Sequence, residues 1–176
     1  PAWLALGKAM YDNPKDVADA TLQLWASQAA LWQAASLRWM GAKDQPLPDL
    51  PHKAQAGKRI AHKEWSENAL FDYLKESYLL TSGWINHTVH TVGDMDPRDR
   101  NKAEFYTRNY VAAMTPANNY ALNPDMLEAT AVQRGGNLVR GLRMMLKDLE
   151  RGKGQLMIRQ TAMDAIEVGR DMAIRP

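Results

Sequence analysis

The stretch SENALFDYLKESYLLTSGWINHTVHTVG, residues 66–93, decides the fold. Its apolar side chains recur every three or four residues, which is the spacing of one face of an α-helix. Ser66 is a suitable N-cap, and Gly93 ends the pattern. The apolar positions are Leu70, Phe71, Leu74, Tyr78, Trp84, Ile85, Val89 and Val92. The stretch therefore predicts a long amphipathic helix with one buried face.

The segments on both sides of this stretch also predict helices. Asn13-Pro14 is a start signal for a helix over residues 14–40, because asparagine caps well and proline suits the first helical position. Asp96-Pro97 starts another helix, which Pro116 ends. The apolar face of that helix is expected to consist of Ala103, Tyr106, Tyr110, Val111 and Met114.

The last part of the chain continues the helical pattern. Asn123-Pro124 starts a helix that runs towards Arg151, with Gly135-Gly136 as a point of break or bend. Residues 155–160 alternate between apolar and polar, so a short strand or extended segment is expected there, followed by one last short helix. The sequence as a whole therefore predicts an all-α (mainly α) multi-helix domain with a short extended segment near the C-terminus.

Composition predicts three segments. Residues 1–42 form an amphipathic, Trp-rich helical arm, which the proline-containing linker of residues 43–64 could leave detached. Residues 65–176 form the helical body. The longest uncharged stretch, residues 20–37, contains three glutamines and two serines, so we do not expect it to span a membrane.

Charge and cysteine content exclude several classes of function. The chain has 22 basic and 20 acidic residues, a net charge of +2, and nothing that would attract nucleic acid. It contains no cysteine, which excludes disulfides, thiolate catalysis and cysteine metal sites, and fits a cytoplasmic protein. The chain opens without a methionine or a signal peptide, so we expect it to begin inside a longer reading frame.

The sequence offers little evidence for catalytic groups. His87 and His90 would share a helix face, and Asp94 is the only local third ligand, so surface histidines are favoured over a metal site. The acids Glu64, Glu67, Asp72 and Glu76 are interpreted as solvated residues of a helix surface. Arg134, Arg140, Arg143 and Lys147 are likewise interpreted as a solvated row. We expect no catalytic residue, no cofactor and no metal in this chain.

The tryptophans of the arm are its least ordinary feature. Trp25, Trp32 and Trp39 recur at a spacing of seven, and Val17, Leu24 and Leu31 recur one place earlier, so both rows lie on one helix face. Two interpretations stay open: the tryptophans are core residues, or the six residues form a contact surface. A dimer seam, a second protein and a lipid-like surface would all use such a stripe.

Several motifs of the predicted body occur in one known family. WSENALFDYLKESYLLT, residues 65–81, is similar to a tryptophan followed by N-P-x-F-D-Y-L-x-x-x-Y-L-L, with Ala69 in place of the proline. Further matches follow in the same order at residues 102–106, 114–119, 123–124, 137–141, 152–154, 158–161 and 168–170, with Asn119 where an aromatic residue is usual. From Lys58 onward the chain thus resembles the N-terminal region of class I polyhydroxyalkanoate synthases.

The resemblance implies an acyltransferase system that polymerises (R)-3-hydroxyacyl-CoA into a storage polyester. The family's nucleophile is a cysteine, assisted by aspartate and histidine, in a C-terminal α/β-hydrolase domain. Since this chain has no cysteine, no catalytic residue carries over to it.

For the N-terminal region, the resemblance implies support of activity, dimerisation and attachment to the polyester granule in the cytoplasm. The expected partners are the catalytic domain, a second copy, and the granule surface or a granule-associated protein. A free-standing helical granule-binding or adaptor protein is the alternative, and a small metal enzyme built on His87 and His90 is a third class.

Overall fold

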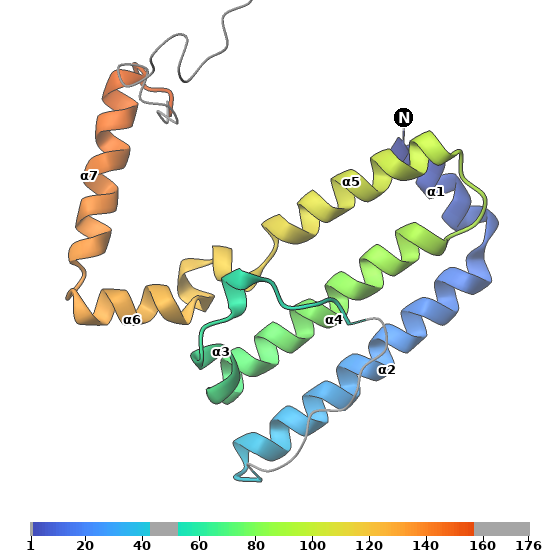
Figure 1. Cartoon of the computed structure of the whole chain (residues 1–176), viewed down its shortest axis with the longest axis horizontal. Helices are drawn as coiled ribbons and strands as arrows, with labels where there is room; N and C mark the ends of the chain where they lie inside the picture. Colours follow the sequence, from blue (N-terminus) through green and yellow to red (C-terminus); the bar gives the residue numbers. More distant parts are fainter. Residues whose placement is uncertain (1, 43–52, 157–176) are drawn as a thin grey trace, which may run out of the picture. The chain divides into compact units, whose positions relative to one another are not determined.

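The computed structural model describes residues 2–42 and 53–156, and within those ranges every regular element is a helix (Figure 1). This confirms the mainly α fold. The chain divides between Leu127 and Glu128 into two compact units, and each is considered by itself. No helix in the described ranges is both long enough and apolar enough to cross a membrane.

Helix α4 (Ala69–Thr91) is the central element of the first unit, with α2 (Pro14–Trp39) along one side and α5 (Pro97–Ala113) along the other (Figure 1). The buried clusters of the unit all include a residue of this helix. Val89 packs with α1 (Ala2–Asp12) and α5, Leu80 packs with Leu31 of α2, and Leu79 packs with Ile60 and Trp65. α4 therefore connects the packing of the whole unit.

The start of α4 differs from the sequence prediction. Asn68, not Ser66, is its N-cap: the Asn68 side-chain oxygen accepts hydrogen bonds from the backbone N–H groups of Leu70 (3.0 Å) and Phe71 (3.4 Å). Ser66 lies in a separate short helix, α3 (Glu64–Glu67), and its hydroxyl accepts a hydrogen bond from Lys75. Asn68 has the extended backbone that a cap requires, so the helix begins after it.

The other start signals are confirmed with one difference. The Asp96 carboxylate accepts from the N–H groups of Arg98 and Asp99, and Asn123 caps α6 (Pro124–Val132) in the same way. Asn13 precedes Pro14 as expected, but its amide donates to the carbonyl of Ala9 instead of capping α2. Ala9 belongs to α1 (Ala2–Asp12), a separate helix within the segment predicted as one helical arm.

The arm packs on the body, so of the two arrangements that the sequence left open, the packed one is observed. α2 packs along α4 through Ser27, Leu31, Ala34 and Ala35, all of which are buried. The Gln28 amide lies between Thr81 and Ser77 of α4, donating to the first (3.0 Å) and accepting from the second (3.1 Å). Small side chains on this face let the two helices approach closely.

The buried face of α5 also differs from the prediction. Ala103, Thr107 and Val111 are buried at a spacing of four residues, whereas Tyr106, Tyr110 and Met114 are more than half exposed. Because the buried residues are small, α5 lies close to α4, and the larger side chains project outward. The prediction was right for Ala103 and Val111 and wrong for the other three.

The remaining elements of the described chain are short turns and two helices. Three 3₁₀ turns, Lys58–Ile60, Pro116–Asn118 and Tyr120–Leu122, connect the longer helices. The glycine pair breaks the expected last helix, because Gly135 has a positive φ of 82° between α6 and α7 (Gly136–Arg151). Residues 157–176, which hold most of the expected extended segment and the last short helix, lie outside the described residues.

Gly93 follows α4 with a positive φ of 44°, and a Cβ there would collide with the Asn13 amide between α1 and α2. We expect Gly93→Ala to lower the free energy of unfolding by at least about 1–2 kcal/mol, the cost of a left-handed residue with a Cβ. Urea unfolding followed by circular dichroism measures the change. Gly57→Ala is the matched control, because its φ is −82° and its Cβ would meet open space. Equal stability of the two variants would contradict this account.

Candidate interaction surfaces

The two rows of α2 that the sequence placed on one face have different environments. Leu31 is fully buried against Leu80 of α4, and Val17 and Leu24 pack at the edges of buried clusters. The tryptophans are exposed by 67% at Trp25, 52% at Trp32 and 43% at Trp39. The three tryptophans therefore form a surface, named here the tryptophan face, beside the row of residues through which the helix packs on its neighbours.

The rings at one end of the tryptophan face pack against one another. Trp32 and Trp39 meet edge to face with centroids 5.3 Å apart. Tyr73 of α4 contacts both, at 5.5 Å from Trp32 and 6.0 Å from Trp39. Such contacts restrict the rings in the free protein, so a partner that binds them has less side-chain motion to suppress. Tyr73 was not among the predicted contact residues, because it lies far from the tryptophans in sequence.

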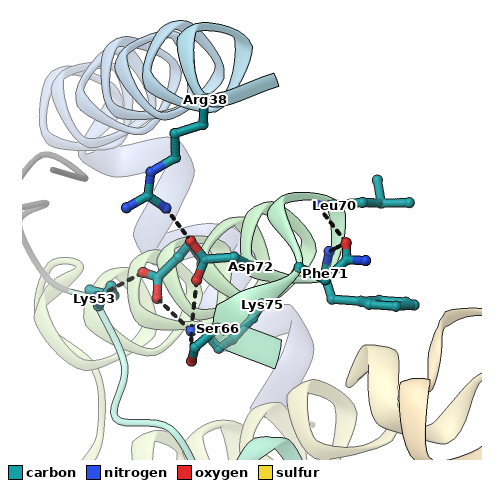
Figure 2. A network of polar contacts seen from close by, with 9 residues as sticks. Arg38, Lys53, Ser66, Leu70, Phe71, Asp72 and Lys75 are labelled. Atoms are coloured by element: carbon teal, nitrogen blue, oxygen red, sulfur yellow. Dashed lines mark hydrogen bonds and ion pairs between the residues drawn. The ribbon is translucent and has the colours of Figure 1, made fainter. Parts of the chain in front are cut away.

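A largely buried ionic network joins α2 to α4 (Figure 2). Arg38 of α2 contacts the Asp72 carboxylate at 2.5 Å, and Lys75 contacts its other oxygen at 2.8 Å. Lys53 and Lys75 contact Glu76 at 2.7 and 3.5 Å. Arg38 precedes Trp39 and Asp72 precedes Tyr73, so this ion pair fixes the register of the aromatic contacts.

The network corrects the interpretation of two acids as surface residues. Asp72 and Glu76 are only 5% and 6% exposed. Burying a carboxylate is costly unless it has a cationic or hydrogen-bonding partner, and each of these two contacts two cationic side chains. The ion pair between Arg38 and Asp72 connects α2 to α4, which is a structural role. Helical spacing alone could not reveal it, because the partners Arg38 and Lys53 lie in other segments.

Helix α7 carries a second apolar surface. Leu138, Leu142, Met145 and Leu146 recur at helical spacing and are 44–53% exposed; they are named here the α7 face. Arg140, Arg143 and Lys147 lie on the other side and are exposed too, as predicted. Arg140 also donates a hydrogen bond to Gln133. No residue of α7 is buried, so its apolar stripe contributes little to packing within the second unit.

The histidine pair takes part in ordinary polar contacts. His90 Nδ1 lies 2.8 Å from Glu104, and His87 borders a hollow between α2 and α4 that Asp16 and Gln23 also line. Among residues 2–42 and 53–156, no three histidine or acidic side chains gather closely enough to hold a metal ion. The expectation of a chain without metal or cofactor stays a prediction.

Comparison with known proteins gives a consistent picture. The family described as "Poly-beta-hydroxybutyrate polymerase (PhaC) N-terminus" matches residues 56–176. The chain is 40% identical over 164 residues to a poly(3-hydroxyalkanoate) polymerase of Methylorubrum extorquens, covering 93% of this chain and 27% of that protein. A polymerase subunit PhaC of Rhizobium etli is 36% identical over 167 residues, covering 93% of this chain and 26% of that protein.

A third relative has a lower sequence identity to the chain. The polymerase subunit PhaC of Cupriavidus necator is 30% identical over 161 residues, covering 92% of this chain and 25% of that protein. The chain thus spans about a quarter of the length of these relatives. No solved structure matches it.

The ionic network predicts a large effect of Asp72→Ala. Arg38 and Lys75 would lose their shared carboxylate, and we expect the free energy of unfolding to fall by about 2–4 kcal/mol. Glu104→Ala is the control, because its partners His90 and Arg108 are 71% and 62% exposed, and we expect a loss below about 1 kcal/mol. Urea unfolding measures both. Equal losses would mean that burial does not strengthen the Asp72 contacts.

Proposed function

The chain belongs to the family of poly-beta-hydroxybutyrate polymerase N-termini, and from this premise we propose that it is a non-catalytic domain of a polyhydroxyalkanoate synthase. The synthase would polymerise (R)-3-hydroxyacyl-CoA into a storage polyester. The lack of cysteine supports a non-catalytic role, since the resemblance implies a cysteine nucleophile. A free-standing granule-binding protein is the alternative, and the match to N-termini of polymerases favours the synthase.

We propose that the domain attaches the synthase to the polyester granule in the cytoplasm through the tryptophan face. The exposure of Trp25, Trp32 and Trp39 on a firmly packed helix is the observation that carries this proposal. Indole rings bury a large apolar area and retain a polar N–H, which suits a surface where hydrocarbon and ester groups meet water. A granule-associated protein would be recognised by the same rings.

We also propose that the α7 face supports activity by packing against the catalytic domain of the same synthase. Its apolar residues are exposed and the opposite side of the helix is basic, which is the pattern of a helix that docks in an apolar groove. A second copy of the chain could occupy the same face and would produce a homodimer. Sedimentation of the isolated chain distinguishes these two partners. If a second copy binds the α7 face, the isolated chain sediments with the mass of a dimer, and if only the catalytic domain binds it, the chain sediments as a monomer.

Replacing Trp25, Trp32 and Trp39 together by alanine tests granule attachment. We expect pelleting of the chain with polyester granules to fall to background while far-UV helicity is retained, because Leu31 and the ionic network still hold α2. Tyr11→Ala is the control for loss of an exposed aromatic, since Tyr11 is 84% exposed on α1. Undiminished pelleting of the triple variant would exclude the tryptophan face as the contact, and loss of helicity would identify the tryptophans as core residues.

Leu142→Asp tests the α7 face. The remainder of the Methylorubrum extorquens polymerase is assayed for CoA release from 3-hydroxybutyryl-CoA with and without this chain. We expect the wild-type chain to raise the rate or shorten the lag, and Leu142→Asp to lose at least about tenfold of that effect, because a buried unpaired charge costs more than 1.4 kcal/mol. Met144→Asp, on the basic side of α7, is the matched control. Equal effects of the two variants would show that the apolar stripe is not the docking surface.

A further inference from the structure

A mainly apolar groove lies between α4 and α5. Two hollows of about 310 Å³ each lie along it, and both are lined by Ile85 of α4 and Tyr110 of α5. The first extends towards Leu74 and Met114, and the second is bounded at its far side by Trp3 and Leu6 of α1. The two hollows together are named here the α4–α5 groove.

The lining of this groove has an unusual chemistry for a protein surface. None of the side chains that line either hollow carries a charge. Apart from the apolar residues, the lining contributes only hydroxyl groups and two indole N–H groups, from Trp3, Ser77, Tyr78, Thr81, Ser82, Trp84, Thr88, Thr107 and Tyr110. A ligand with a carboxylate, phosphate or ammonium group would find no counter-charge here, so the groove suits a neutral ligand.

Two buried polar atoms of residues that line the second hollow have no hydrogen-bond partner among the protein atoms. They are the indole nitrogen of Trp84 and the hydroxyl of Thr88, whose residue is 7% exposed. Three other helical threonines, Thr21, Thr81 and Thr91, donate to the carbonyl four residues earlier, and Thr88 does not. Unpartnered buried donors are rare in folded proteins, and an ester carbonyl would satisfy them. Trp84 and Thr88 also border the more polar hollow beside α2.

Trp3, which lines the second hollow, belongs to a cluster of exposed aromatic rings. Trp3 contacts Tyr106 with centroids 6.4 Å apart, and Tyr106 contacts Phe105 at 5.5 Å. Each of these rings is more than half exposed. Exposed apolar rings beside an apolar hollow are typical of a binding site for an elongated, weakly polar ligand.

We propose that the α4–α5 groove binds a segment of neutral polyester made of short 3-hydroxyacyl units, with Trp84 and Thr88 donating to its ester carbonyls. The inference rests on the proposed function for the identity of the polyester and assigns it a site apart from the tryptophan face. Such a chain alternates short hydrocarbon segments with uncharged acceptors, which matches the lining. Each hollow could hold roughly ten non-hydrogen atoms, or about two four-carbon units.

Calorimetric titration of the whole chain with the methyl ester of the (R)-3-hydroxybutyrate tetramer tests this proposal. We expect saturable binding that Ile85→Trp weakens at least about tenfold, because the larger ring would fill the part common to both hollows. Tyr11→Ala, which lies outside both the groove and the tryptophan face, should leave the affinity unchanged. The tetramer with a free carboxylate should bind more weakly than its methyl ester. Absence of saturable binding, or equal affinity of the Ile85→Trp variant, would overturn the proposal.

Thr88→Val keeps the test decisive if Ile85→Trp does not fold. Valine has nearly the same shape and removes an unpartnered hydroxyl, so the free chain should be at least as stable as the wild type. We expect the affinity for the tetramer ester to fall roughly three- to tenfold, the value of one neutral hydrogen bond. A stable Thr88→Val variant with undiminished affinity would remove Thr88 from the site and overturn the proposed contact.

Granule pelleting separates this inference from the proposed function. If the chain pellets with granules but does not bind the tetramer ester, the proposed function is retained and polyester binding in the α4–α5 groove is refuted. If the chain binds the ester in a way that depends on Ile85 but does not pellet, polyester binding in the groove is supported and granule attachment is refuted. Conversion of a dimer into a monomer by Ile85→Trp would show that a second copy occupies the groove, which would also overturn the proposal.

Discussion

The packing of α4 between α2 and α5 is the interaction on which the rest of the first unit depends. Small side chains at the two interfaces, among them Ala34 of α2 and Ala103 of α5, let both helices lie close to α4. Because these faces are small, the large side chains of α2 and α5 are left on the outside. The exposed tryptophans and tyrosines are therefore a geometric result of close helix packing, and every surface discussed above for this unit depends on it.

The residues that carry the family resemblance stabilise this fold. Trp65 is fully buried, and Phe71 packs against it edge to face. Asn68 caps α4, and Asp72 joins α4 to α2. The motif thus sets the start of the central helix and its attachment to its neighbour. The surfaces proposed for granule, catalytic domain and polyester lie mostly outside the motif, and a family resemblance by itself would not have located them.

Local signals were predictable from the sequence, whereas partnerships between segments were not. Asp96-Pro97 and Asn123-Pro124 begin helices as expected, because capping depends on residues that are adjacent in sequence. The glycine pair at 135–136 separates two helices for the same reason. The buried state of Asp72 depends on Arg38, and the outward position of Tyr106 depends on how closely α5 approaches α4. Periodicity identifies a helix face but not the neighbour that covers it.

The buried ionic network has a consequence for how this unit responds to salt. Mobile ions screen charges only where water reaches them, and at physiological ionic strength that screening acts over roughly 8 Å. Asp72 and Glu76 are enclosed, so dissolved ions reach the junction of α2 and α4 poorly. Contact of the exposed indole rings with an apolar surface is, in turn, strengthened by strongly hydrated salts. A domain with this arrangement would remain folded as the ionic composition around it changes. The granule attachment proposed for it would also be retained.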